Sequence, residues 1–241
     1  MNDHPGYELF DELGRGENTV VYRGYDLDLG RPMAVKALDP ESQKDPQRIA
    51  QFLSEASFLA QFEHENILRI YSVDRERGWI VMELMEGTLE SQIAASAMSP
   101  DVVRSVISQV LSALDFLHQN GKIHGAVRPS NILINEQGRV KLSDFEAIES
   151  EGVLRAPTGS KKHLAPEVLR PEFGDFGPGL DLYRLGFTAL ELLTGPKFAS
   201  LFPGTGQEAI DANVAWMRGH SSDEQLPPRK QIRPQTPHDV A

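Results

Sequence analysis

The stretch His124-Gly125-Ala126-Val127-Arg128-Pro129-Ser130-Asn131-Ile132-Leu133 decides how this chain of 241 residues is interpreted. A second polar cluster, Ser143-Asp144-Phe145-Glu146, follows it, with Asp144 thirteen residues after Asn131. Ala165-Pro166-Glu167 and Asp181-Leu182-Tyr183-Arg184-Leu185-Gly186 come next. What these clusters mean depends on the segments that precede them.

The first third of the chain predicts strands and one helix. Residues 7–38 alternate apolar and polar side chains between glycines, which is typical of three short antiparallel strands. Residues 46–62 change to helical spacing, with apolar residues on one stripe. Two further strand-like runs follow at 67–73 and 79–84.

The remainder predicts helices. Ser99-Pro100-Asp101 is a strong helix start, and the apolar stripe after it continues to about Asn120. Further helices are expected at 180–194 and near 207–217, and the proline-rich last twenty residues are expected to be extended. We therefore predict two lobes, residues 1–86 and 87–241.

Composition excludes several classes of protein. The chain has 24 basic and 35 acidic residues, a net charge of −11, which argues against a general binder of nucleic acid or of anionic membranes. The absence of cysteine excludes disulfides, cysteine-bound zinc and thiol nucleophiles. The seven histidines show no metal-ligand spacing. With neither a membrane-spanning run nor a signal peptide, we expect a cytoplasmic protein.

The first candidate site residues along the chain are a pair of glycines. Gly14 and Gly16 form half of a G-x-G-x-x-G pattern, and a plain hairpin turn that needs positive φ is the alternative. Lys36 follows inside an apolar strand, where an unpaired ammonium would be costly to bury. Glu55 lies on the helix expected to pack against that strand. Solvated surface positions remain the alternative for both charged residues.

Taken in order, these motifs resemble the protein-kinase family, and specifically its bacterial Ser/Thr kinase-like branch. The resemblance implies an α+β, bilobal fold with a five-stranded antiparallel N-lobe sheet plus one helix and a mainly helical C-lobe. It runs from about Tyr7 to the C-terminus. The last two helices of the family would begin where this sequence ends, so we expect a C-lobe truncated at its end, with Glu167 lacking its usual arginine partner. We favour a fragment of a longer protein, and a lobe capped in another way is the alternative.

The resemblance implies ATP and Mg²⁺ as ligands, bound weakly or not at all. Lys36 would hold the α- and β-phosphates and Glu55 would fix Lys36, while Asn131 and Asp144 would hold the metal through oxygen atoms. The remaining nucleotide-binding positions would be the glycines of the loop, apolar residues around adenine and the main chain of 83–85: Gly14, Gly16, Val21, Ala34, Leu133, Met82, Glu83 and Met85. For Val21, Ala34 and Leu133, simple core packing is the alternative.

Four departures from the family pattern are expected to surround the same phosphates. Ala126 stands where the family has the aspartate base, and Gly125 replaces the arginine that docks a phosphorylated segment. Glu146 replaces the glycine of Asp-Phe-Gly, and Thr19 replaces the third loop glycine. Arg128 stands at the catalytic-loop lysine and keeps its charge.

The same resemblance implies structural roles for two further side chains. His124 would join an apolar column with Phe145, Leu59 and Ile70, and Asp181 would accept backbone hydrogen bonds from the catalytic loop. The sequence therefore predicts a pseudokinase that binds a nucleotide or a protein partner as a signalling or scaffold module, with no nucleic acid or membrane contact. The alternatives are a weakly active Ser/Thr kinase and a structural domain with an empty pocket.

Overall fold

The computed structural model describes residues 5–16, 18–144 and 177–197, without the side chains of Glu55 and Phe58. The chain forms two compact units, Met1–Glu86 and Gly87–Ala241. Each unit has its own sheet. The two units are described separately below.

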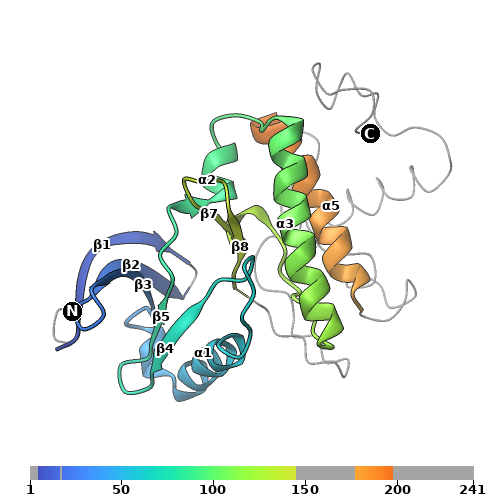
Figure 1. Ribbon diagram of the computed structural model, residues 1–241. Helices are drawn as coiled ribbons and strands as arrows, with labels where there is room; N and C mark the ends of the chain where they lie inside the picture. The colour runs from blue at the N-terminus through green and yellow to red at the C-terminus, as the bar shows by residue number, and fades with distance from the viewer. Residues whose placement is uncertain (1–4, 17, 145–176, 198–241) are drawn as a thin grey trace. The chain divides into compact units, whose positions relative to one another are not determined.

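The first unit is built on a five-stranded sheet in which every pair of neighbours is antiparallel (Figure 1). Its order is β1-β2-β3-β5-β4, so β3 is central and β1 and β4 are the edges. The predicted five-stranded antiparallel sheet is thus confirmed. The strands are β1 (Tyr7–Arg15), β2 (Thr19–Asp26), β3 (Arg31–Leu38), β4 (Ile70–Asp74) and β5 (Trp79–Met82).

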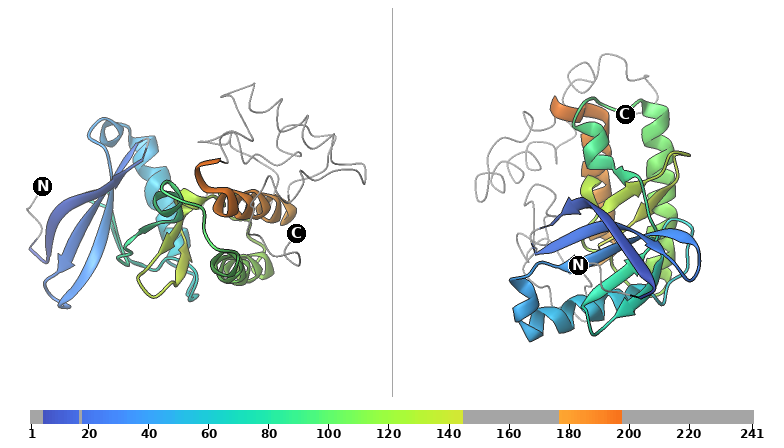
Figure 2. Two further views of the ribbon diagram at one scale, coloured as in Figure 1. Left: turned by 90° about the horizontal axis from the view of Figure 1, so that it is seen from above. Right: turned by 90° about the vertical axis from the view of Figure 1, so that its left-hand side faces the viewer.

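The two faces of this sheet bury different apolar clusters, because successive side chains of a strand point to opposite faces. Met33, Val35 and Ala37 of β3 pack on one face with Trp79. Leu38 packs on the other face with Phe52 and other residues of helix α1 (Pro46–Leu59). Figure 2 shows α1 alongside β4 and β5, which it contacts. The helix therefore covers the face on which the even-numbered residues of β3 lie.

Two boundaries differ from the sequence prediction for local reasons. Strand β4 begins at Ile70 rather than at 67, because the preceding residues form a turn in which the N–H of Ile67 donates to the carbonyl of His64 (3.1 Å). Helix α1 ends at Leu59 rather than at 62, because the N–H of Phe62 bonds the carbonyl of Leu59 in a tighter turn.

The second unit combines a small sheet with helices. Its three-stranded sheet has the order β6-β7-β8, and helices α3 and α5 lie side by side and in contact (Figure 1). The elements are β6 (Gly87–Thr88), α2 (Leu89–Ile93), α3 (Pro100–Gln119), η2 (Pro129–Asn131), β7 (Ile132–Ile134), β8 (Val140–Leu142), α5 (Gly179–Thr194) and η5 (Gly195–Lys197).

Helix α3 begins as the sequence predicts. The Ser99 hydroxyl oxygen accepts the N–H of Val102 (3.4 Å), and Pro100 occupies the first helical position. The apolar stripe that follows is buried, including Val103 and Val106. No helix in the part of the chain that the structure describes has both the length and the apolar character needed to cross a membrane. The expected helix near 207–217 and the extended C-terminal residues lie outside the described ranges.

Candidate functional site

The glycine-rich hairpin joins β1 to β2 and closes on itself. The N–H of Gly16 donates to the carbonyl of Thr19 (2.8 Å). Neither Gly14 nor Gly16 has positive φ, so the hairpin does not use them as left-handed turn residues. A Cβ at Gly14 would meet nothing within 4 Å, whereas a Cβ at Gly16 would lie 2.8 Å from the Thr19 hydroxyl oxygen. The Thr19 hydroxyl therefore fills the space beside Gly16, and the Thr19 carbonyl engages the N–H of Gly16.

The register of the sheet brings four predicted nucleotide-binding residues to one face. In the ladder, Lys36 lies between Val21 and Ile80, and Ala34 lies opposite Met82. Directly opposed residues point to the same face, and Ile80 packs against α1 on that face. Val21, Ala34, half-buried Lys36 and Met82 therefore share the face that α1 covers.

The predicted ion pair between Lys36 and Glu55 stays a prediction, because the Glu55 side chain lies outside the described residues. At the end of the first unit, the N–H of Glu83 donates to the carbonyl of Arg69 (3.0 Å). Met85 is buried. Pairing of this stretch with a base likewise stays a prediction.

In the second unit, Asp181 is the acceptor around which the catalytic loop is arranged. Its carboxylate lies at the start of α5, has no exposed area, and accepts the N–H groups of His124 and Gly125, each at 2.8 Å. The ring Nε2 of His118, at the end of α3, lies 2.8 Å from the same carboxylate. The predicted structural role of Asp181 is confirmed.

His124 is held as a neutral ring. Its Nδ1 accepts the N–H of Ala126 (3.1 Å), so Nε2 carries the proton and donates to the carbonyl of Ser143 (3.1 Å). Complete burial lowers the pKa of His124 to about 4, against the opposing effect of the Asp181 charge. The ring is therefore neutral at physiological pH and joins the loop to the residue before Asp144, as a structural role requires.

Ala126 and Asn131 are tied together through the main chain. The Asn131 side-chain Nδ2 donates to the carbonyl of Ala126 (2.9 Å), and Ser143 donates to the carbonyl of Asn131 through both its N–H (2.9 Å) and its hydroxyl (3.1 Å). Since Nδ2 is engaged, a cation would have to use the amide oxygen of Asn131, which also accepts a hydrogen bond from the Ser130 hydroxyl (3.3 Å).

The other predicted residues of this unit surround the loop. Asp144 is exposed and has a φ of 54°, a left-handed conformation that aspartate tolerates better than most residues. Half-buried Arg128 is extended and precedes η2, and its Nε has no hydrogen-bond partner among the described residues. Leu133 on β7 pairs with Thr88 and Lys141. Phe145 and Glu146 lie outside the described residues.

The oxygen donors of Asn131 and Asp144 suit Mg²⁺, which prefers carboxylate and carbonyl oxygens. Within the described ranges, no three acidic, histidine or cysteine side chains form a metal-binding group.

The sequence model of the protein kinase domain matches residues 7–237. The chain belongs to the protein kinase domain family. The two units are thus the two lobes of an α+β, bilobal kinase fold, with the five-stranded sheet and α1 in the N-lobe and the longer helices in the C-lobe.

Its relatives include bacterial Ser/Thr kinases. It is 35% identical over 224 residues to serine/threonine-protein kinase PknL of Mycobacterium tuberculosis, covering 88% of this chain and 53% of that protein. It is 31% identical over 243 residues to serine/threonine-protein kinase PrkC of Bacillus subtilis, covering 97% of this chain and 36% of that protein. The chain thus spans about half the length, or less, of these curated relatives.

Within the kinase fold, the position of Gly125 explains one departure from the family pattern. Gly125 has a φ of 76°, so an arginine there would have to adopt a left-handed conformation at a cost of about 1–2 kcal/mol. The glycine thus relieves strain in a loop that Asp181 holds.

Sequence reasoning missed two members of this network, His118 and Ser143. Ser143 directly precedes the Asp-Phe motif, so its place in the chain was a usable signal. His118 lies 63 residues from its partner Asp181, and only its position in the last turn of a predicted helix pointed to it.

Proposed function

We propose that this kinase-like domain is a pseudokinase, a nucleotide-binding signalling or scaffold module with little or no phosphotransfer. The single observation behind the proposal is the state of residue 126. Its methyl side chain is 1% exposed and offers no acceptor for a hydroxyl proton, while its N–H and carbonyl are both bonded to the loop. The frame of the catalytic loop is kept without its base.

Losing a general base costs about 10²–10⁴-fold in rate, which alone leaves a slow kinase. We expect the rate of phosphotransfer to be lower still because of the N-lobe hairpin, where the N–H of Gly16 is bonded to the carbonyl of Thr19 and the Thr19 hydroxyl lies beside Gly16. Phosphoryl transfer depends on placing the terminal phosphate as much as on the base. The two departures together support a module that holds nucleotide weakly and turns it over very slowly.

Nucleotide binding would use groups of both lobes. Lys36 would contact the α- and β-phosphates and Arg128 would supply a planar cation with two parallel donors. Mg²⁺ held by Asn131 and Asp144 would neutralise charge on the phosphate oxygens. The contribution of this chain is to orient these groups, since the Asn131 amide is fixed by its bond to the carbonyl of Ala126.

A thermal-shift titration with ATP, with and without Mg²⁺, tests binding, and a sensitive phosphotransfer assay on the same protein tests turnover. We expect a small shift that is lost in Lys36→Ala and no detectable turnover. Rapid Mg²⁺-dependent phosphorylation that disappears in both Lys36→Ala and Asp144→Ala would overturn the proposal.

A weakly active Ser/Thr kinase is the second candidate, and it is supported by the bacterial relatives and by the intact frame around Asp181. Ala126→Asp separates the two candidates. We expect it to raise phosphotransfer by less than about tenfold, because a base acts only when the phosphate and metal are already placed. A rise of about 10³-fold or more, the full contribution of a base, would favour the weak kinase.

The third candidate, a structural domain with an empty pocket, predicts no shift with ATP at any Mg²⁺ concentration. We propose a protein as the partner of the module and the cytoplasm as its compartment. The net charge of −11 favours a protein partner over nucleic acid or an anionic membrane.

A further inference from the structure

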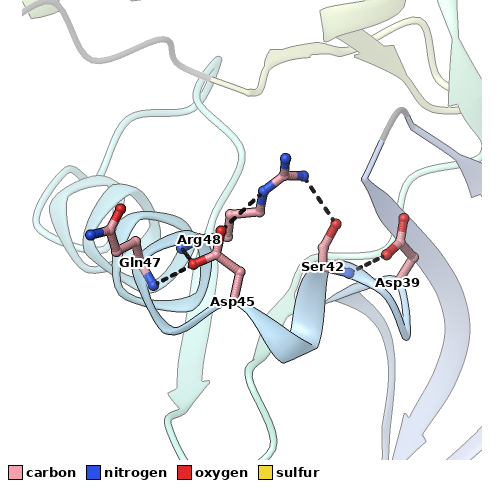
Figure 3. A network of polar contacts seen from close by, with 5 residues as sticks. All are labelled: Asp39, Ser42, Asp45, Gln47 and Arg48. Carbon is pink, nitrogen blue, oxygen red and sulfur yellow. Dashed lines mark hydrogen bonds and ion pairs between the residues drawn. The ribbon is translucent and has the colours of Figure 1, made fainter.

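The connection between β3 and α1 contains two aspartates whose carboxylates accept backbone N–H groups of consecutive turns. Asp39 follows β3 and accepts the N–H of Ser42, the first residue of the short helix η1 (Ser42–Lys44), and Asp45 precedes α1. Figure 3 shows these aspartates with Ser42, Gln47 and Arg48 as one continuous polar network. None of the five residues belongs to the family motifs described above.

Asp39 is bonded in two directions. Its backbone N–H donates to the carbonyl of Asn18 (2.9 Å), which extends the β2–β3 ladder into the glycine-rich hairpin. Its carboxylate Oδ1 accepts the N–H of Ser42 (2.7 Å), and its carbonyl accepts the N–H of Gln43 (3.0 Å). One residue thus holds the hairpin on one side and the first turn of the connection on the other.

The network continues from Ser42 into α1. Buried Ser42 accepts the N–H of Asp45 (3.2 Å) at its carbonyl and the Nη1 of Arg48 (3.4 Å) at its hydroxyl. Asp45 accepts the N–H groups of Gln47 (2.9 Å) and Arg48 (3.4 Å), as an N-cap does. The Arg48 Nε lies 3.5 Å from the same carboxylate. Each turn is therefore fixed to the one before it.

The carboxylate of Asp39 is ionised at physiological pH. The hydrogen bond from the N–H of Ser42 is the main cause that lowers the pKa of Asp39 below its usual value. The charged form is therefore the one that holds the first turn of the connection.

We infer that Asp39 is a positioning residue of the nucleotide site, which couples the glycine-rich hairpin to the start of α1. The inference rests on the proposed nucleotide binding. A phosphate that orders residues 14–19 also orders the main chain of Asn18, and through Asp39 and Ser42 the first turn of α1. Helix α1 carries Glu55, so the coupling would set the helix in place when nucleotide is bound.

A cap that acts only on its own turn would have no effect on the nucleotide site, and Asp74 provides a matched control for such a cap. In the β4–β5 turn, Asp74 accepts the N–H groups of Glu76 and Arg77, both at 3.0 Å. Asp74 lies on the edge strand β4, which β5 and β3 separate from the strands of the glycine-rich hairpin. Asp74→Ala therefore removes a cap of the same kind without touching the proposed coupling.

The experiment is hydrogen exchange by mass spectrometry on the whole chain, with ATP and Mg²⁺ or without, together with the dissociation constant for ATP. In the unmodified protein, ATP should slow exchange both at 16–22 and at 43–49. In Asp39→Ala, exchange at 43–49 without ATP should rise about fivefold, as for the loss of one cap. ATP should then protect 16–22 alone and bind about fivefold more weakly.

Asp39→Asn keeps an oxygen acceptor at the same position and should restore protection at 43–49 and ATP affinity to within about twofold. Asp74→Ala should leave both readouts unchanged. The inference is overturned if Asp39→Ala binds ATP as tightly as the unmodified protein and ATP still protects 43–49.

A chain that binds no ATP would refute the proposed function, and Asp39→Ala without ATP then tests the coupling alone. Faster exchange at 16–22 as well as at 43–49 supports the coupling. Faster exchange confined to 43–49 overturns it.

Discussion

The glycine-rich hairpin of the N-lobe and the catalytic loop of the C-lobe are held in opposite ways. In the catalytic loop, the N–H groups of His124, Gly125 and Ala126 all end on buried side chains. In the hairpin, the bonds at Gly16 and Asn18 are between main-chain atoms, and the loop is largely exposed. The first loop is therefore fixed by its surroundings, and the second depends on its neighbours along the sheet.

This difference separates a loop held by buried side chains from a loop held by its own main chain. In the C-lobe, the loop around His124 is bonded to Asp181 and to the His124 ring. In the N-lobe hairpin, the Thr19 carbonyl accepts the N–H of Gly16 and the Thr19 hydroxyl fills the space beside Gly16. Replacing a buried hydrogen-bond acceptor should thus lower the free energy of unfolding far more than altering the hairpin does. Three measurements test that ranking.

The largest effect is expected from Asp181→Ala. It leaves the buried N–H groups of His124 and Gly125 without their acceptor, at a cost of about 4 kcal/mol in the free energy of unfolding. Urea unfolding followed by circular dichroism measures this loss. The control is Asp101→Ala on α3. The Asp101 side chain is 87% exposed and pairs with Arg104, so its loss should lower the free energy of unfolding by less than about 1 kcal/mol. Equal losses in the two variants would show that Asp181 does not organise the loop.

The second effect is a loss of stability in mild acid. The folded state keeps His124 neutral down to about pH 4, whereas a histidine in the unfolded chain protonates near pH 6.5. Between these values the unfolded state binds the extra proton, so the free energy of unfolding should fall by about 3 kcal/mol as the pH drops.

Urea unfolding at half-unit steps of pH measures this slope, and His124→Gln, which removes the titrating ring, should flatten it. Asp39 and Asp74 do not interfere, because their pKa values are lowered and their contributions are lost only at still lower pH. A slope that is the same in His124→Gln would contradict the assignment.

The smallest effect compares one glycine from each loop. Gly125→Ala forces a side chain onto a φ of 76° and should cost about 1–2 kcal/mol. Gly16→Ala needs only a rotation of the Thr19 side chain and should cost less than about 1 kcal/mol. Thermal unfolding of the two variants side by side gives the difference. A larger loss for Gly16→Ala would reverse the ranking of the two loops.

Most of the fold could be predicted from the sequence, because the longer elements carry a clear period. The five strands of the first sheet and the helices α1, α3 and α5 were found in this way. The small sheet β6-β7-β8 was not, since strands of two or three residues are too short to show alternation.

The site was predicted in part for a related reason. Motif order predicted structural roles for His124 and Asp181, which the hydrogen bonds support, and a metal-binding role for Asn131, which stays a prediction. It could not reveal that Thr19 closes over Gly16, or that His118 contacts Asp181, because both depend on distances in the folded chain. Nor could it foresee the left-handed φ of Gly125, which a glycine permits but does not require.

Residue 126 is held through its main chain alone, by the ring of His124 on one side and the amide of Asn131 on the other. Those two bonds form with any amino acid except proline at this position, and a methyl group fits the buried space. A lineage can therefore lose the proton acceptor in one replacement while it keeps the domain folded. At this position the bonds that fold the loop do not depend on the side chain that would do the chemistry. Selection for stability alone therefore does not oppose the loss of the proton acceptor.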